Sequence, residues 1–275
     1  TLAYLLPLTE LLDVRSDEVQ AVVVVPGREL ALQSATVLKN MGCGLRGMAC
    51  YGGRATMEEH RKLREIRPQI VFATPGRLND HLDKANILAG SIRYLILDEF
   101  DKCLEMGFHE EMKALLDKLP KEVRSVLLSA TPAEELGNAH VVEKHFRRID
   151  FLPIEAQVPE RVYIYKVKSP QKDKLETLEK LLLSFGEQRS IVFLNHREAV
   201  ERTAEFLSAA GFGVSVYHGG MEQKLREAAL YKYANGSTNI LVSTDLASRG
   251  LDIPDIDNIV HYHLPESEDG YIHRV

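Results

Sequence analysis

Short apolar runs alternate with longer amphipathic segments along almost the whole chain. Several runs are apolar at every position, which is typical of parallel strands buried on both faces. The expected strands are residues 21–25, 48–51, 70–73, 94–97, 125–128, 162–167, 191–194, 214–217, 240–242 and 259–262. The segments with helical spacing are residues 2–12, 30–41, 57–66, 108–119, 175–185, 197–210 and 225–233. The pattern predicts an α/β fold in which right-handed crossovers connect parallel strands.

The periodic pattern is interrupted between residues 152 and 160. Pro153 and Pro159 lie in this stretch, and the apolar pattern restarts at Val162. We predict a first domain of residues 1–152, a linker of residues 153–160 and a second domain of residues 161–275.

Composition adds only broad limits. With 45% hydrophobic and 27% charged residues, the 275-residue chain has the make-up of a soluble globular protein. No apolar run approaches the roughly 18 residues that span a bilayer, and no signal peptide is recognisable. The three cysteines, Cys43, Cys50 and Cys103, form no CxxC pair and favour neither a disulfide framework nor a zinc site. We expect a cytoplasmic protein with reduced thiols and no membrane partner.

The net charge of −6 does not indicate a basic surface for nucleic acid. This argument is weak, because a protein that binds a few phosphates needs only a local cluster of donors.

Polar residues gather directly after the predicted strands. These polar turns are residues 26–29, 74–77, 98–99, 129–131 and 243–245. Ligands of open α/β sheets bind at the carboxyl ends of the strands, because loops and helix N-termini converge there. We therefore expect each domain to carry its functional residues along one edge of its sheet.

The strongest local signal is an apolar strand that ends in two adjacent carboxylates, Asp98 and Glu99. An Asp at a strand end can hold Mg²⁺ against nucleotide phosphates, and the following Glu can orient the attacking water. A solvated acidic turn after a strand is the alternative, and the pair alone does not decide between them.

Eight short motifs occur in one order along the chain. They are residues 26–33, 74–77, 98–101, 129–131, 191–195, the pair Gln223 and Arg226, residues 243–253 and residues 271–274. Together they resemble the motifs of the DEAD-box branch of superfamily 2 helicases. The resemblance covers nearly the whole chain, and it implies two RecA-like domains, each a mostly parallel sheet with helices on both faces.

The resemblance further implies an ATP-dependent RNA helicase that uses Mg²⁺. The catalytic residues that it implies are Asp98, Glu99, Asp101, Ser129 and Thr131. Asp98 and the Thr1 hydroxyl would hold Mg²⁺, Glu99 would position water, and Asp252 would approach the ribose of ATP. Asp101, Ser129 and Thr131 would couple the state of the nucleotide to domain closure.

RNA would be bound through its backbone, without sequence specificity, as a single strand or short duplex that a monomer locally unwinds. The residues implied for this role are Arg28, Gly53, Thr74, Arg77, Gln223, Arg226 and Thr244. Guanidinium forks, hydroxyls and exposed amides suit phosphate recognition and do not read bases.

The sequence departs from the family pattern in several places. Phe100 stands where the family has Ala, and Gly27 stands where it usually has Thr. Of the P-loop only its last residue can be present, as Thr1, and the chain stops at Val275, before further arginines of the sixth motif. We expect neither substitution to abolish function, but we expect these 275 residues alone not to hydrolyse ATP.

Two other functions stay open. One is a DNA helicase or translocase of the same superfamily, and the other is a non-enzymatic RNA-binding scaffold with a decayed ATPase. Single residues also have simpler interpretations, since Gly52 and Gly53 can be an ordinary turn and Arg226 a solvated helix residue. His261 and His263 flank Tyr262, and we expect histidines of a strand there, not metal ligands.

Overall fold

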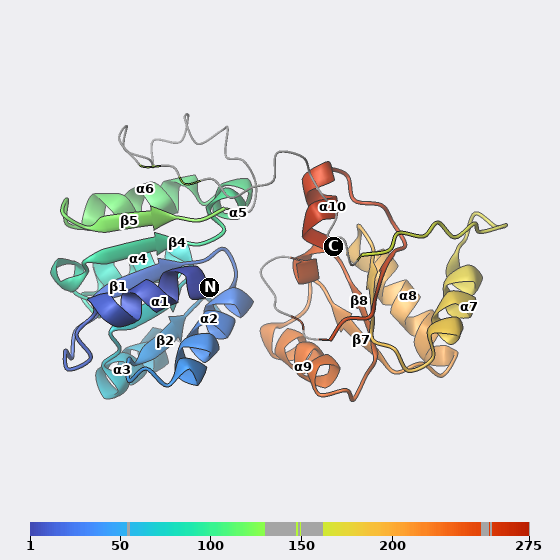
Figure 1. Cartoon of the computed structure of the whole chain (residues 1–275), viewed down its shortest axis with the longest axis horizontal. Coiled ribbons are helices and arrows are strands. Elements are labelled where there is room, and N and C mark those ends of the chain that lie inside the picture. Colours follow the sequence, from blue (N-terminus) through green and yellow to red (C-terminus); the bar gives the residue numbers. More distant parts are fainter. Residues whose placement is uncertain are drawn as a thin grey trace. The chain divides into compact units, whose positions relative to one another are not determined.

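The computed structural model describes residues 1–53, 56–129, 147, 149, 162–248, 253 and 255–274. The chain divides into two compact units, Thr1–Leu152 and Pro153–Val275. Each unit contains one parallel sheet covered by helices (Figure 1). Among the helices that the structure describes, none has both the length and the apolar character needed to cross a bilayer.

Unit 1 is built on a five-stranded parallel sheet. Across the sheet the strands are β2 (Gly47–Cys50), β3 (Ile70–Ala73), β1 (Ala21–Val24), β4 (Tyr94–Leu97) and β5 (Arg124–Leu127). All residues of β1 and β3 are buried, as the uninterrupted apolar runs predict. Strand β1 is central, between β3 and β4, and its alternating side chains enter the two apolar clusters on the two faces of the sheet.

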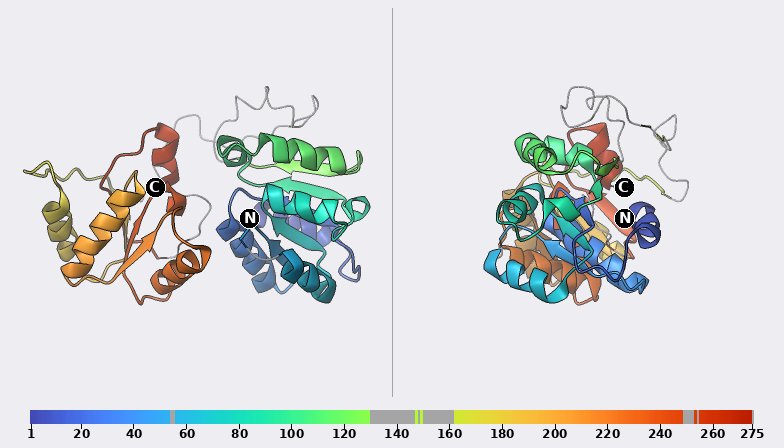
Figure 2. Two further views of the ribbon diagram at one scale, coloured as in Figure 1. Left: turned by 180° about the vertical axis from the view of Figure 1, so that it is seen from behind. Right: turned by 90° about the vertical axis from the view of Figure 1, so that its left-hand side faces the viewer.

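The helices of unit 1 form two layers, one on each face of the sheet. They are α1 (Leu2–Leu11), α2 (Arg28–Met41), α3 (Thr56–Ile66), α4 (Pro75–Asp83), α5 (Phe100–Glu105) and α6 (His109–Lys118). Helices α1 and α2 share one core with Val23 and Phe72, whereas α4, α5 and α6 share the other with Val22 and Val71. The right-hand view of Figure 2 shows α1, in dark blue, and the green α6 on opposite sides of the sheet.

Unit 2 repeats this arrangement around a four-stranded parallel sheet. Across the sheet the strands are β7 (Val214–Tyr217), β8 (Ile240–Ser243), β6 (Ser190–Phe193) and β9 (Asn258–His261). Helices α7 (Leu175–Phe185) and α8 (Arg197–Ala209) pack on one face with Val192 and Val242. On the other face α9 (Gln223–Ala234) packs with Phe193 and Leu241. The chain continues through α10 (Glu268–Arg274).

The predicted α/β fold is confirmed, and one predicted strand is wrong. Residues 162–167 form no strand, and Tyr163 and Tyr165 are 78% and 82% exposed. A run of β-branched and aromatic residues becomes a strand only where another strand pairs with it, and local sequence does not report that partner. Helices α4, α5 and α10 were not predicted, because each is short, and α4 and α5 also begin within or next to a polar turn.

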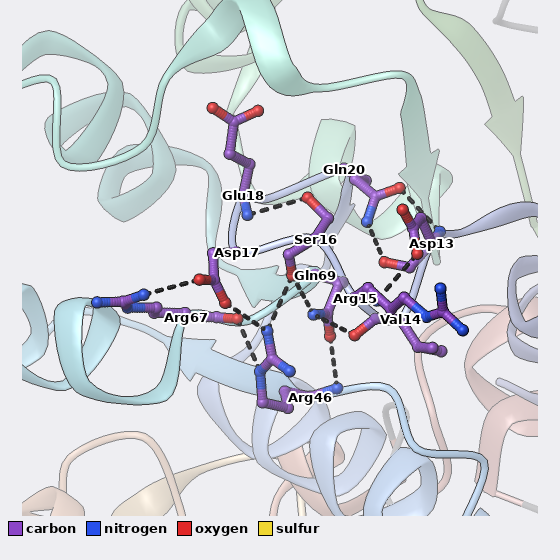
Figure 3. A network of polar contacts seen from close by, with 10 residues as sticks. All are labelled: Asp13, Val14, Arg15, Ser16, Asp17, Glu18, Gln20, Arg46, Arg67 and Gln69. Carbon is purple, nitrogen blue, oxygen red and sulfur yellow. Dashed lines mark hydrogen bonds and ion pairs between the residues drawn. The ribbon is translucent and has the colours of Figure 1, made fainter.

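A polar network lies at the amino ends of the unit 1 strands, opposite the predicted site (Figure 3). The fully buried Gln69 side chain accepts a hydrogen bond from the Arg46 backbone N–H at 2.8 Å. Its amide nitrogen donates to the carbonyl oxygens of Val14 and Ser16 at 3.2 and 2.5 Å. One side chain therefore bonds to three partly buried backbone groups and joins the loop before β1 to the starts of β2 and β3.

Replacing Gln69 by Leu should destabilise unit 1 by about 2 kcal/mol, since the Arg46 N–H and the Val14 carbonyl lose this partner, whereas Ser16 O keeps Arg46 Nη2 at 2.9 Å. Urea unfolding followed by circular dichroism measures the change. Asp17→Ala is the matched control from the same network, because Asp17 forms exposed ion pairs with Arg46 and Arg67 that contribute little. An equal loss in both variants would contradict the role given to Gln69.

Candidate functional site

The strand register of unit 1 brings the predicted polar turns to one edge. The backbone N–H of Asp98 donates to Val24 O at 2.9 Å, and that of Val25 donates to Ala73 O at 3.0 Å. Thr74 and Leu128 continue the same row, with their N–H groups bonded to Cys50 O and Leu97 O. The turns after all five strands therefore leave the sheet at one level, as expected for a ligand-binding edge.

Asp98 is a partly buried carboxylate near the start of α1. The Glu99 backbone N–H donates to Asp98 Oδ1 at 3.1 Å, and the Tyr4 hydroxyl interacts with both Asp98 and the Thr1 side chain. Burial raises the pKa of Asp98 and the charge of Asp101 adds to this, while hydrogen bonds from Tyr4 and the Glu99 N–H oppose it. The structure thus places Thr1 and Asp98 around the same tyrosine, and among the described residues the effect of burial on the Asp98 pKa outweighs that of the hydrogen bonds.

Glu99 lies at a backbone turn between β4 and α5. Its φ of 48° and ψ of 50° fall in the left-handed region, which is strained for a residue with a side chain. The next residue donates its N–H to Leu128 O at 3.0 Å and so joins the turn to the end of β5. This turn ends the strand directly after Asp98 and starts a helix.

Asp101 and Ser129 lie near Glu99 on the same edge. Burial raises the pKa of the Cys103 thiol to about 12, helped by the charges of Glu99, Asp101 and Asp98, so these acids surround one side chain. Ser129 directly follows Leu128 at the end of β5. Thr131 lies outside the described residues.

The two departures from the family pattern have clear structural consequences. Phe100 is fully buried and packs in the core between the sheet and α4, α5 and α6, so its ring occupies the interior and not the acidic edge. Gly27 is the N-cap of α2, and Ala31 N–H bonds to its carbonyl at 3.2 Å. Glycine at this position costs the helix only a few tenths of a kcal/mol relative to Thr.

Arg28 and the Gly52–Gly53 turn lie against each other. Gly53 has a φ of 92°, and a Cβ added there would lie 2.7 Å from Arg28 Nη1 and 3.2 Å from its Cζ. A Cβ at Gly52 would lie 3.8 Å from Arg28 Nη2. The turn therefore uses glycine both for its backbone angle and to admit the guanidinium, which exceeds what an ordinary turn requires.

Arg77 is held by its own unit. Its side chain is 10% exposed, and Nη1 lies 2.8 Å from Thr56 Oγ1 and 3.2 Å from Glu59 Oε2. Thr74 precedes Pro75, the first residue of α4, and is the N-cap of that helix. The sequence placed Thr74 and Arg77 in the site but missed Glu59.

In unit 2 the strand ends again form one row. Thr244 N–H donates to Tyr217 O at 3.3 Å, and Leu194 N–H donates to Ser243 O at 2.9 Å. At the start of α9, Arg226 Nη2 lies 2.5 Å from Gln223 Oε1, and Arg226 is 9% exposed. The simple interpretation of Arg226 as a solvated helix residue is therefore wrong.

Arg274 lies within the motif of residues 271–274, and its sequence position alone gave it no separate role. Its guanidinium is fully buried, bonds to Asp245, and donates to His263 O at 2.8 Å and Asn195 Oδ1 at 3.0 Å. It also lies 5.1 Å from the centre of the Phe193 ring. One side chain thus joins α10 to the ends of β6, β8 and β9, through partners too distant in sequence for a local pattern to reveal.

His261 and His263 have separate structural partners. The His261 ring stacks on Tyr271 with centroids 5.2 Å apart, and His263 Nδ1 accepts from Asn195 N–H at 3.3 Å. Burial lowers the pKa of both imidazoles. Asp252, predicted to approach ribose, lies outside the described residues.

Fold and site define a protein with two parallel α/β units, each carrying polar turns on the carboxyl edge of its sheet. Residues 1–139 match the family model for the DEAD/DEAH box helicase, and residues 173–275 match that for the helicase conserved C-terminal domain. The chain belongs to the DEAD/DEAH box helicase family.

Relatives of known name align with the entire chain. It is 32% identical to the ATP-dependent RNA helicase CshA of Listeria monocytogenes and 31% identical to the DEAD-box ATP-dependent RNA helicase CshA of Geobacillus kaustophilus. The alignments cover 100% of this chain but 53% and 59% of those proteins, so the chain spans little more than half their length.

Solved structures share the fold. Saccharomyces cerevisiae Dbp5 bound to RNA and ADP BeF3 matches 99% of this chain and 71% of its own, with a TM-score of 0.84 and 24% identity. A DEAD box protein of Methanococcus jannaschii matches 99% of this chain and 74% of its own, with a TM-score of 0.51 and 29% identity. The expected RecA-like fold of both units is confirmed.

Replacing Asp98 by Asn should stabilise the ligand-free protein at neutral pH. Because burial raises the pKa of Asp98 in the folded state, the ionised carboxylate costs stability above that pKa. The gain should shrink as pH falls and vanish below the pKa of the unfolded chain, where both states are protonated. Thermal unfolding between pH 4 and 8 measures it.

Asp117→Asn, an exposed change on α6, is the control and should show no such trend with pH. A stability difference for Asp98→Asn that grows as pH falls has the opposite sign and would refute the assignment.

Proposed function

We propose that the protein is an ATP-dependent RNA helicase that binds the RNA backbone without sequence specificity and separates short duplexes. The observation that carries this proposal is the arrangement on one edge of unit 1. Asp98 and Glu99 lie at the end of β4, and the contact between Arg28 and Gly53 lies beyond β1 and β2 on the same edge. The names of the CshA relatives agree with it.

The residues around Asp98 fit a divalent cation. A carboxylate with a pKa raised by burial, next to a threonine side chain, offers the oxygen ligands that Mg²⁺ prefers. Asp98 and Thr1 would hold Mg²⁺, which when bound neutralises charge on the phosphates of ATP. Glu99 would orient the attacking water and accept its proton, and Asp101 with Ser129 would respond to the nucleotide.

Backbone recognition of RNA fits the donors on the two edges. In unit 1 these are the Arg28 guanidinium, the Gly52–Gly53 amides and Thr74, and in unit 2 they are Gln223, Arg226 and Thr244. Guanidinium and amide donors of this kind bind phosphate oxygens and leave the bases unread. The expected ligand is therefore a single strand or a short duplex of any sequence.

We also propose a monomeric protein of the cytoplasm. The three cysteines are free, and two of them are buried, which suits a reducing compartment.

The first test is Glu99→Gln in the longest natural form of the protein that contains this chain. ATP should still bind, while RNA-stimulated hydrolysis should fall at least about 100-fold, because a positioned base for the attacking water is lost. Glu110→Gln, an exposed change in the first turn of α6, is the control and should keep full turnover. Unchanged hydrolysis by Glu99→Gln would refute the role of Glu99.

The same assay separates the proposed function from its rivals. If DNA stimulated ATP hydrolysis by the wild-type protein as strongly as RNA does, a DNA helicase would be supported. RNA binding without any hydrolysis would support a scaffold with a decayed ATPase.

The second test is Gly53→Ala. The added Cβ would lie 2.7 Å from Arg28 Nη1 and must displace this guanidinium, so RNA affinity should fall about tenfold. Fluorescence anisotropy with a labelled oligonucleotide measures the dissociation constant. Gly107→Ala is the control, because its φ of 82° brings similar backbone strain while nothing lies within 4 Å of its added Cβ. Unchanged affinity in a folded Gly53→Ala variant would show that Arg28 and the turn make no contact with RNA.

A further inference from the structure

An ion network behind the candidate RNA-binding edge of unit 1 has no part in the chemistry proposed above. We call it the Glu59 cluster, and it comprises Tyr51, Thr56, Glu59, Arg77 and His81. We propose that Glu59 is a positioning residue for RNA, which fixes both the Gly52–Gly53 turn and Arg77 without contacting the ligand. This inference rests on the proposed function, since RNA is the ligand for which it sets the geometry.

The first contact of Glu59 fixes the turn. Glu59 Oε1 accepts a hydrogen bond from Tyr51 N–H at 3.1 Å, and Tyr51 is fully buried directly after β2. Gly52 and Gly53 follow at once, so the carboxylate of α3 determines where the backbone leaves the strand. The position of the Gly53 backbone in turn determines the space left for the Arg28 guanidinium.

The second contact fixes the start of α4. Arg77 Nη1 lies 3.2 Å from Glu59 Oε2 and 2.8 Å from Thr56 Oγ1, which joins the first turn of α4 to the first turn of α3. The Thr56 hydroxyl also bonds to Asp80. Because Thr74 is the N-cap of α4, the same contacts hold its position on the edge.

The third contact closes the cluster from the core side. Asn86 Nδ2 donates to His81 Nδ1 at 3.1 Å, so the proton of the neutral imidazole is on Nε2. That nitrogen lies 3.0 Å from Glu59 Oε2 and donates to it. His81 is fully buried and Glu59 is 2% exposed, so water cannot replace these donors.

The cluster depends on the negative charge of Glu59. A buried carboxylate is tolerated where a cation and hydrogen-bond donors surround it, and here the partners are one guanidinium and two N–H groups. In Glu59→Gln one oxygen becomes an NH₂ group. If the remaining oxygen stays with Tyr51, the NH₂ faces the donors of Arg77 and His81, and both contacts are lost.

A metal site is the competing interpretation, because the ligand atoms of Cys50, Glu59 and His81 all lie within 4.8 Å of one another. Both oxygens of Glu59 already face donors, and a guanidinium lies 3.2 Å from one of them. Burial and the charge of Glu59 also raise the pKa of the Cys50 thiol and oppose the thiolate that a metal would need. The cluster is therefore better described as an internal ion network.

The experiment compares Glu59→Gln with Glu58→Gln in RNA-stimulated ATP hydrolysis by the longest natural form of the protein. The RNA concentration for half-maximal stimulation should rise about tenfold in Glu59→Gln, because the backbone-binding groups are misplaced. The kcat at saturating RNA and the KM for ATP should stay within about twofold, since Asp98 and Glu99 are untouched. Glu58, one residue away and paired with Lys62 at 3.0 Å on the surface, should tolerate the change.

Thr56→Val is a second variant that keeps the shape of the side chain and removes one anchor of Arg77. This variant should raise the RNA concentration for half-maximal stimulation about threefold. It tests the inference even if Glu59→Gln does not fold. The inference would be overturned if the RNA concentration for half-maximal stimulation were unchanged in either folded variant, or if only kcat fell. If RNA did not stimulate ATP hydrolysis by the wild-type protein, the proposed function would be refuted. If RNA stimulated the wild-type protein and both variants equally, only the role of Glu59 would be refuted.

Discussion

The hydrogen-bonded register of the parallel strands is the constraint on which both candidate sites depend. In unit 1, Val24 is paired with Ala73 on one side and with Leu97 on the other, so the chain leaves three strands at one level. In unit 2, Phe193 is paired with Ser243 and His261 in the same way. A slip of one residue would move a strand end by about 3.3 Å and turn its side chains to the opposite face. The apolar residues that fix the register therefore also place the polar turns.

Register alone does not fix the turns themselves, and each unit uses a buried charged side chain for this. Glu59 joins the end of β2 to α3 and α4, and Arg274 joins the ends of β6, β8 and β9 to α10. Burying a charge is unfavourable unless its partners surround it, so such a residue tolerates few alternative arrangements. The strained backbone at Glu99 is held in a similar way, by the hydrogen bond from the next residue to Leu128.

The sequence predicted those parts of the molecule that local pattern determines. Nine of the ten expected strands form, because runs such as those of β1 and β3 are apolar throughout and only a two-sided core can bury them. The strand expected at residues 162–167 does not form, since pairing depends on a distant partner. Motif order placed Asp98 and Arg28 on one edge, but the contacts of Glu59 and Arg274 join residues 22 and 79 positions apart. No local pattern carries that information.

Two carboxylates of unit 1, the buried Glu59 and the partly buried Asp98, differ in how far the protein itself satisfies their charge. Glu59 has a guanidinium and two N–H groups within 3.2 Å, so its charge is satisfied by the protein itself. Asp98 has one backbone N–H and the Tyr4 hydroxyl, and burial still raises its pKa. A carboxylate paired like Glu59 gains little free energy from an added cation. A carboxylate like Asp98 gains more, because a bound cation offsets the unfavourable burial of its charge. Among the described residues, the raised pKa of Asp98 and the paired charge of Glu59 therefore favour the proposal that Asp98, and not Glu59, binds the ligand.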